Sequence, residues 1–456
     1  MTPTTAATTP RTADIAAALQ GYDPQALHAD AVTAFLQRLV EPVTEVQRVP
    51  LPEALGRVLA EDVISPISVP PHDNSAMDGF AFDGAQLQPG QPLRLRCVGT
   101  ALAGTAWRAA VAAGECVKIM TGAVMPAGLD TVVPQEFTRV EGAQVELPAD
   151  VVRRGDNRRP LGEDLMAGRV ALPRGTRLSP AALGLLASLG LGEVAVLRRL
   201  RVAYFSTGDE ILSLGQAPRE GAVYDSNRYT VSALLARLGV EVIDLGVVPD
   251  RPDALRAAFG QAAARADAVI TSGGVSVGEA DHTRAMMRQL GDVVFWRIAM
   301  RPGRPMAVGR IAAAALGLQQ ESGPGACPTS ASSSQNNSDS AILFGLPGNP
   351  VAVMVTFLAF VRPALLRMMG ARPEPPVLLR AQSSQAIPKK PGRTEYQRGI
   401  VSTQPDGRLR VCTTGNQGSG VLSSMVQANG LIVLGHAQGD VAVGDEVSVM
   451  MFEGVL

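Results

Sequence analysis

The chain has few cysteines and histidines, and their positions exclude the structures usually built from them. The chain has four cysteines, which form no C-x-x-C pair and lie far apart in the sequence, namely Cys97, Cys116, Cys327 and Cys412. They therefore predict neither a disulfide framework nor a zinc knuckle. His72, His282 and His436 form no ligand-spaced set, so we expect no histidine metal site. This cysteine usage fits a reducing, cytoplasmic location best.

A charge surplus and a long hydrophobic run are also missing. Lys and Arg total 41 against 42 Asp and Glu, and this balance gives no reason to expect a nucleic-acid partner. The longest apolar run, 351–361, is far shorter than the roughly 18 residues of a membrane span. The first residues lack a signal peptide pattern. We therefore expect no membrane partner and a disordered tail at 1–26.

The remaining sequence divides by texture into several domains, as its 456 residues predict. Helical spacing over 27–63, including LPEALGRVLAEDV, and again over 165–198 predicts a helical base. Short apolar runs split by Gly and Pro predict a β-rich lid module at 64–164, inserted in that base. Residues 373–456 predict a small C-terminal β-barrel, with a sandwich as the alternative.

Strand and helix patterns alternate from 199 to 372, which predicts a doubly wound α/β domain around a parallel sheet. We expect VVFWRIAM, RPMAVGRI and AILFGLPGNP to continue this sheet. A Ser-, Asn-, Gly- and Pro-rich stretch at 317–340 predicts a disordered insertion. The predicted fold class is thus multidomain α/β plus β.

Three polar loops follow predicted strands of this domain, where ligands of parallel sheets collect. In TSGGVSVGEAD, glycines and hydroxyls fit a phosphate, and the acids after them predict bridging magnesium. STGDE repeats hydroxyls, glycine and acids, and LPGNP precedes a helix. Taken singly, each has a simpler interpretation as a Gly-rich or rigid turn.

The segment WRIAMRPGRP adds Arg297, Arg301 and Arg304. Guanidinium groups bind phosphate and other oxyanions in bidentate fashion, although any one of these arginines is also explained as a solvated surface residue. Outside this domain, PPHDNSAMDG and KIMTGAV are either functional or ordinary turns. Acidic and basic sets together favour phosphoryl chemistry.

The motifs DNSAMDGFA, KIMTGAVMPAG, GEDL, STGDEI, YDSN, TSGGVSVGEAD, RPGRP and LPGNP, in this order, resemble the molybdopterin molybdenumtransferase family, MoeA-like and gephyrin E-domain-like. The resemblance covers about residues 27–456. It implies that 199–372 bind molybdopterin and that the protein inserts molybdate into adenylylated molybdopterin with Mg²⁺, releasing AMP and molybdenum cofactor. It also implies a homodimer whose site joins the α/β domain of one subunit to the lid of the other.

The resemblance carries functional roles onto matching positions. The residues implied to be catalytic are Asp78, Thr121, Glu210, Asp250 and Asp281. Glu210 and Asp281 are also the implied magnesium ligands. The substrate-binding residues taken from the motifs and the resemblance are Asp164, Ser206, Thr207, Gly208, Asp209, Ser272, Gly273, Gly274, Ser276, Arg297, Arg301, Arg304, Pro347, Gly348, Asn349 and Pro350.

The chain departs from the family pattern in four places. Arginines replace the lysines of the W-K-x-x-x-K-P-G-K segment, which keeps the charge. Ala352 replaces a common serine, Pro160 and Leu161 stand in a segment that is often basic, and 317–340 has no counterpart. These changes put one hydroxyl contact in doubt and leave oxyanion binding in place.

Two rival functions remain at this point. The adenylyltransferase that makes the substrate has a similar α/β domain but is usually a compact single-domain protein. A receptor-clustering scaffold uses the same architecture with added domains and linkers, which are absent between the motifs here. We favour the enzyme. The expected partners are a second copy, the adenylyltransferase, and molybdoenzymes or cofactor carriers.

Overall fold

The computed structural model describes residues 11–19, 21–275, 282–312 and 340–452. Ser276, Asp281, Cys327, nearly all of the predicted insertion and part of the predicted tail therefore lie outside the described residues. The chain forms two compact units. Unit 1 comprises Met1–Gln47, Gly56–Val58 and Leu197–Leu456, and unit 2 comprises Arg48–Leu55 and Leu59–Val196.

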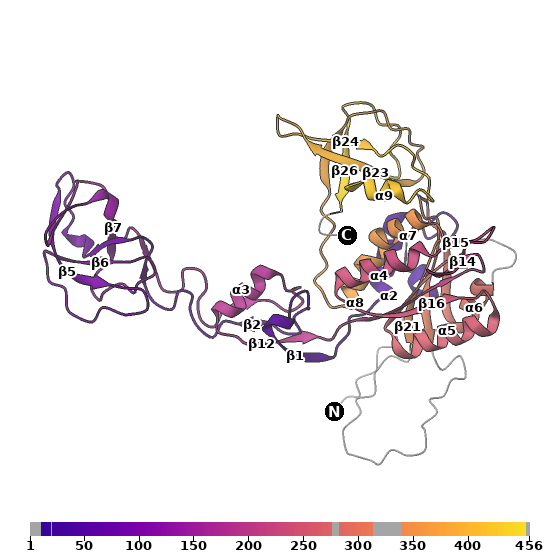
Figure 1. The fold of residues 1–456 in the computed structure, drawn as a ribbon, viewed down its shortest axis with the longest axis horizontal. Helices are drawn as coiled ribbons and strands as arrows, with labels where there is room; N and C mark the ends of the chain where they lie inside the picture. Colours follow the sequence, from indigo (N-terminus) through magenta and orange to yellow (C-terminus); the bar gives the residue numbers. More distant parts are fainter. Residues whose placement is uncertain (1–10, 20, 276–281, 313–339, 453–456) are drawn as a thin grey trace, which may run out of the picture. The chain divides into compact units, whose positions relative to one another are not determined.

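Unit 2 contains the predicted β-rich lid as a six-stranded sheet in the order β7-β4-β6-β5-β9-β8 (Figure 1). These strands are Thr131–Pro134, Gly79–Phe82, Glu115–Ile119, Leu93–Ala101, Gln144–Leu147 and Arg139–Glu141. Alternate residues of each strand point to opposite faces, and the sheet has one buried cluster that includes Phe80 and Phe82 and another that includes Ala81.

The second part of unit 2 is less helical than the sequence predicts. Helix α3 (Pro180–Ser188) begins at Ser179, whose side chain accepts a hydrogen bond from the Ala182 N–H. The predicted helix in LPEALGRVLAEDV is wrong, because a single 3₁₀ turn at Leu51–Glu53 is followed by β2 at Val63–Ile64. Gly56 has a φ of +72°, which no α-helix continues through.

Unit 1 is built on a six-stranded sheet in the order β16-β13-β17-β21-β20-β18. The strands are Glu241–Val248, Arg201–Thr207, Ala268–Ser272, Ser340–Leu346, Pro305–Ala312 and Gly291–Arg297. The first four are parallel, but β20 is antiparallel to both of its neighbours. The parallel prediction is therefore wrong at β20. Only the short segment 298–304, which includes strand β19 (Met300–Arg301), joins β18 to β20, whereas parallel neighbours need a long crossover.

Helices cover both faces of this sheet, which confirms the doubly wound prediction. Helices α4 (Ser226–Leu238) and α7 (Pro350–Thr356) pack together on one face. Helices α5 (Pro252–Arg265) and α6 (His282–Leu290) pack together on the other, over a core that includes Ala203 and Phe205 of β13. Because side chains alternate along a strand, Tyr204 points to the α4 and α7 face.

The C-terminal strands form the predicted small β-barrel. Strands β22 (Leu379–Ser383), β23 (Thr394–Thr403), β24 (Leu409–Thr413), β25 (Gly430–Leu434) and β26 (Glu446–Met451) close in the order β23-β24-β22-β26-β25-β23. Strand β19 (Met300–Arg301) pairs with β23, so that Arg301 is opposite Glu395. The RPGR segment of the α/β domain is thereby attached to the barrel.

Two further features concern the ends and the long helix. Thr12–Ala17 of the predicted disordered tail form helix α1, and the Thr12 N–H donates to the Asp292 carboxylate at 2.5 Å.

Residues Pro350–Met368, which run from α7 through a π-helical turn to α8 (Arg362–Met368), are long and apolar enough to cross a membrane. However, 72% of this stretch is buried inside the structure, as in a core helix.

Candidate active site

The three polar loops of the α/β domain lie at one edge of its sheet. Strands β13, β17 and β21 are parallel, and Ser206 is in register with Ser272, which is in register with Leu346. The loops STGDE, TSGG and LPGNP therefore begin side by side. Strand β18 runs in the same direction as β21, and its last residue, Arg297, lies at the same edge.

The paired glycines of TSGG allow a very close backbone approach. Gly273 has a φ of +96°, and a Cβ atom there would lie 2.5 Å from the Thr207 carbonyl oxygen. Gly274 has a φ of +65°, and its Cβ would lie 2.4 Å from Thr283. The Gly273 N–H donates to the Leu346 carbonyl at 3.1 Å. This amide is thus bonded within the sheet, and the predicted substrate-binding role of Gly273 stays a prediction.

Two predicted substrate-binding serines belong to a buried hydroxyl cluster. The Tyr204 hydroxyl lies 2.8 Å from Ser206 Oγ and 2.7 Å from Ser272 Oγ, and the two serine oxygens are 3.1 Å apart. Burial raises the pKa of Tyr204, so that it stays protonated. Tyr204 fixes both serines and was missed by the sequence analysis, because a tyrosine within an apolar strand is equally typical of a core.

The acids that follow β13 and β16 are joined by a chain of hydrogen bonds. Thr207 and Thr283 hydroxyl oxygens are 3.2 Å apart, and Thr283 Oγ1 donates to Asp250 Oδ1 at 3.0 Å. The Asp250 N–H donates to Asp209 Oδ1 at 3.3 Å. The Thr283 hydroxyl proton is already donated to Asp250, so the Thr207 hydroxyl donates the hydrogen bond between the two threonines. These contacts hold two carboxylates at the edge of the sheet.

Glu210 lies next to this chain of hydrogen bonds. A Cβ on Gly208 would lie 2.5 Å from Glu210 Oε2, so this glycine lets the carboxylate fold over the loop. The predicted metal partner, Asp281, is outside the described residues. Across the described ranges, no group of three or more His, Cys, Asp or Glu is arranged to hold a metal ion.

The basic segment faces the same edge, and the barrel adds a fourth arginine. Arg297, Arg301 and Arg304 are exposed, and within the described ranges none of them has a carboxylate partner. Arg398 of β23 is 1% exposed. Burial, and then the charge of Arg301, lower its pKa to about 10.

Arg398 is positioned from three sides. Its Nε donates to Ser424 Oγ at 2.9 Å, and its Nη2 donates to the carbonyls of Asn416 and Gly418 at 3.2 and 3.0 Å. The loop that holds it also touches the α/β domain, because the Val351 N–H donates to the Ser419 carbonyl at 3.1 Å. The sequence analysis missed Arg398. Its only signal was one arginine in the barrel strand TEYQRGIV.

The LPGNP loop at this edge is hydrogen-bonded to helix α4. Asn227 Nδ2 donates to the Gly348 carbonyl at 2.7 Å. Pro347 is buried, Asn349 is exposed, and Pro350 is the first residue of α7. The sequence predicts that the amides at the start of α7 bind an anion. The Val351 N–H is instead bonded to the barrel, so this amide is not free to bind one.

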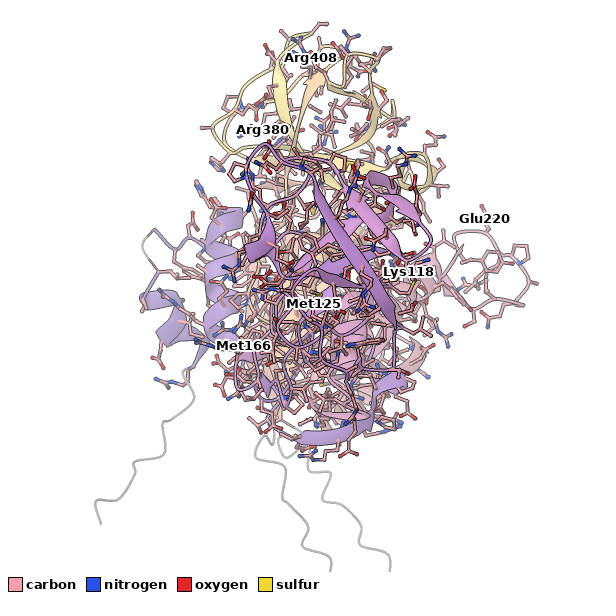
Figure 2. The ribbon with its side chains drawn as sticks, turned by 90° about the vertical axis from the view of Figure 1, so that its left-hand side faces the viewer. Lys118, Met125, Met166, Glu220, Arg380 and Arg408 are labelled. Carbon is pink, nitrogen blue, oxygen red and sulfur yellow. The ribbon has the colours of Figure 1, made fainter. Side chains whose placement is uncertain are left out.

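In unit 2, the predicted residues Asp78 and Thr121 lie together. Asp78 Oδ1 accepts hydrogen bonds from the Thr121 N–H and from its hydroxyl, both at 2.7 Å. The bond from the Thr121 N–H lowers the pKa of Asp78 most, and the bond from the Thr121 hydroxyl lowers it next. The positive charge of Lys118 (labelled in Figure 2) lowers this pKa slightly further. Asp164 is exposed, and its backbone N–H donates to the Val69 carbonyl at 3.0 Å.

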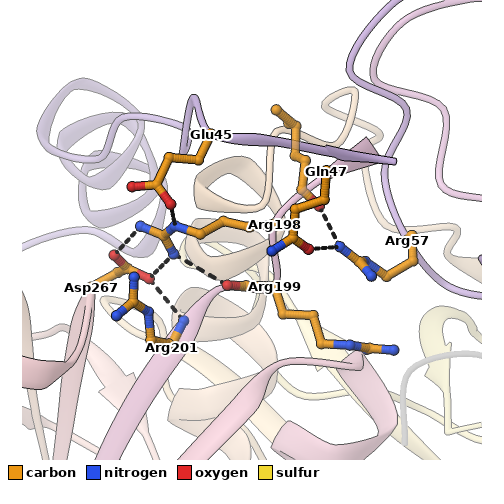
Figure 3. A network of polar contacts seen from close by, with 8 residues as sticks. Glu45, Gln47, Arg57, Arg198, Arg199, Arg201 and Asp267 are labelled. Atoms are coloured by element: carbon orange, nitrogen blue, oxygen red, sulfur yellow. Dashed lines mark hydrogen bonds and ion pairs between the residues drawn. The ribbon is translucent and has the colours of Figure 1, made fainter. Parts of the chain in front are cut away.

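A separate polar cavity of about 350 Å³ lies at the amino ends of β13 and β16 (Figure 3). Arg198 there donates to both oxygens of Asp267, at 2.7 and 2.8 Å, and to Glu45 at 2.8 Å. Ligands of parallel sheets bind at the opposite, carboxyl edge. We therefore assign this network to the stability of unit 1 and place the candidate site at the loop edge.

The sequence and the fold both match known proteins. Three family models match in chain order: the MoeA N-terminal region (domain I and II) at residues 27–190, a probable molybdopterin binding domain at 203–367, and the MoeA C-terminal region (domain IV) at 380–452. The crystal structure of the molybdopterin biosynthesis MoeA protein from Pyrococcus horikoshii OT3 is similar at a TM-score of 0.74 and 26% identity. The matched region covers 94% of this chain and 100% of the Pyrococcus horikoshii chain.

Two relatives are called molybdopterin molybdenumtransferase. The one from Haemophilus influenzae is 38% identical over 427 residues, which are 93% of this chain and 98% of the relative. The one from a Nostoc species is 36% identical and covers 87% of this chain and 86% of the relative. On these matches across nearly its whole length, the chain belongs to the molybdopterin molybdenumtransferase family, which is a family of transferases.

Proposed function

We propose that the protein inserts molybdate into adenylylated molybdopterin, with Mg²⁺-dependent release of AMP, and so completes the molybdenum cofactor. The observation that carries this proposal is the convergence of carboxylates, hydroxyls and arginines at one edge of the α/β sheet. A dinucleotide-like substrate with a phosphoanhydride needs oxygen ligands for a metal, and molybdate needs cations. Both sets are available at this edge.

The acidic side of the site fits magnesium. Asp209, Glu210 and Asp250 offer only oxygen donors, which Mg²⁺ prefers. The absence of a three-residue cluster in the described ranges is compatible with this, because Mg²⁺ is usually held by one or two carboxylates together with substrate phosphates and water. We assign Glu210 and Asp281 to the metal. When bound, it polarises the phosphate and lowers the pKa of its water.

Two further aspartates, Asp250 and Asp78, have proposed roles that do not involve the metal. Asp250 is held by the hydroxyl of Thr283 and lies at the end of β16, where it orients or deprotonates the attacking water. In unit 2, Asp78 has a lowered pKa, so it is ionised at neutral pH and acts as an acceptor beside Thr121.

The basic side of the site fits molybdate. Arg301 lies on β19, which pairs with β23, the strand that carries Arg398. Burial, and then the charge of Arg301, lower the pKa of Arg398, and a dianion near both arginines would relieve their repulsion. We therefore propose that these two arginines hold molybdate next to the dithiolene and that Arg297 and Arg304 extend the cationic surface. The arginines replace family lysines without loss of charge.

Replacing Arg398 by methionine tests this assignment. Losing a charge-assisted contact to an oxyanion typically weakens binding by about ten- to a hundredfold, so the molybdate concentration for half-maximal AMP release should rise by that factor. Arg380→Met controls for the loss of one positive charge from the barrel, since Arg380 (labelled in Figure 2) is an exposed barrel arginine 3.7 Å from Glu446. Equal molybdate requirements in both variants contradict the assignment.

The function itself is tested with the full-length protein, adenylylated molybdopterin and Mg²⁺, with and without molybdate, by measuring AMP release. Molybdate-dependent AMP that stops on magnesium chelation is the expected result. Tight nucleotide binding without AMP supports the scaffold alternative and refutes the insertase. The homodimer, the cytoplasmic location and the partners, namely the adenylyltransferase and a cofactor acceptor, are further proposals, and gel filtration with light scattering tests the first.

A further inference from the structure

Two buried side-chain oxygens at the start of helix α4 lack hydrogen-bond partners among the described residues. They are Asp225 Oδ2 and Asn227 Oδ1, and the two residues are only 4% and 8% exposed. The other polar atoms of both side chains are engaged. Asp225 Oδ1 accepts from the Arg228 N–H at 3.0 Å, and Asn227 Nδ2 donates to the Gly348 carbonyl at 2.7 Å.

Buried acceptors without a donor cost free energy, and most folded proteins avoid them. Here two such atoms occur within three residues, in the YDSN motif. The cap and the bond to Gly348 hold both side chains in place, so neither oxygen turns outward to find a donor. An arrangement of this kind is stable if a ligand completes it.

The position of the two oxygens connects them to the candidate site. Asn227 is bonded to the LPGNP loop at the carboxyl end of β21. The charge of Asp225 contributes, after burial, to the raised pKa of Tyr204, whose hydroxyl is bonded to Ser206 and Ser272 at the ends of β13 and β17. Through the Gly348 bond, the unpartnered oxygens are placed at the start of α4 next to the LPGNP loop, which follows the strand that is in register with Ser272.

Within the proposed function, we infer that Asp225 and Asn227 form a specificity subsite that accepts two hydrogen bonds from a neutral donor edge of the substrate. A carboxylate and an amide oxygen offer acceptors at these two positions, and a carboxylate repels phosphate and molybdate. The donor edge is thus either the amino and ring N–H groups of the pterin or the hydroxyls of the ribose. A subsite of this kind rejects analogues that lack the donors, because its own oxygens then stay unpaired.

The variant Asp225→Asn isolates this role. Asparagine caps a helix as well as aspartate does, so the bond to the Arg228 N–H is retained, while the unpartnered oxygen becomes an N–H donor. Asp83→Asn is the matched control, because Asp83 caps a 3₁₀ turn in unit 2 through its bond to the Ala85 N–H. Both variants are made in the full-length protein.

The experiment titrates each protein with 6-hydroxymethylpterin and, separately, with AMP, and records melting temperatures. We expect Asp225→Asn to bind one of the two ligands about ten- to a hundredfold more weakly, with the other ligand and the melting temperature unchanged. Weaker pterin binding assigns the subsite to the ring, and weaker AMP binding assigns it to the ribose. The Asp83→Asn control should match the parent protein.

Unchanged affinity for both ligands, or no binding of either by the parent protein, overturns the inference. If Asp225→Asn does not fold, Asp225→Ser replaces it, since serine also caps the helix but removes the second oxygen. The AMP-release assay separates the two proposals. AMP release by the parent protein together with full ligand affinity in the variant refutes the subsite alone. Weaker binding in the variant without AMP release by the parent protein refutes only the insertase reaction.

Discussion

Replacing Gly273 by alanine should damage both the stability and the activity of unit 1. An L-residue in a left-handed conformation costs about 1–2 kcal/mol, and Gly273 has a φ of +96°. The new Cβ would also lie 2.5 Å from the Thr207 carbonyl oxygen, and overpacking of this kind adds about 1–3 kcal/mol. The expected loss in the free energy of unfolding is thus about 2–5 kcal/mol.

Gly392 provides the matched control for this substitution. Its φ is +89°, and nothing lies within 4 Å of a Cβ placed there, so Gly392→Ala should cost only the conformational part, about 1–2 kcal/mol. Urea unfolding in a Trp107→Phe background measures the difference. Of the two tryptophans, Trp296 then remains as a buried reporter within unit 1.

The activity of the same variants completes this test. Relief of the clash moves β17 away from β13 at the loop edge, so AMP release by Gly273→Ala should fall by more than about tenfold, because small displacements at a reacting site are costly. Gly392→Ala should keep the parent rate. Equal stability losses in the two variants, with full activity in Gly273→Ala, refute the close-approach argument.

Two further predictions concern the acids. Thr283→Val removes the donor to Asp250, and AMP release should fall about tenfold with the fold retained, as rate measurements and thermal unfolding can check. An unchanged rate would show that this hydrogen bond is not needed for the reaction. In the lid, hydrogen bonds from Thr121 lower the pKa of Asp78. Their stabilising effect is present above the unfolded-state pKa and is lost as the pH falls through the folded-state pKa, below about pH 4. Thr121→Val should raise the Asp78 pKa part of the way to its ordinary value, because the backbone N–H bond remains, and a carboxyl carbon NMR titration checks this shift.

Local patterns in the sequence were enough to predict most of the strands and loops that form the candidate site. In STGDE, hydroxyls, a glycine and acids follow one another, and in TSGG hydroxyls are followed by two glycines; both motifs begin at strand ends as expected. The predictions failed where contacts between residues far apart in the sequence decide the local structure. The helix predicted after Pro52 is a single 3₁₀ turn. Cys97 and Cys116, far apart in sequence, are register neighbours on parallel strands β5 and β6.

By itself, the sequence determined the alternation of strand and helix from 199 to 372 and the chemical character of each loop, because hydrophobic period and glycine placement act over a few residues. Tertiary structure alone decided the reversal of β20, the hydrogen bond from the Gly273 amide to the Leu346 carbonyl, and the pairing of β19 with barrel strand β23. It also left the two oxygens of YDSN buried without donors. Such features depend on which strands pair and which loops meet, and residues far apart in the chain fix those contacts only when the core packs.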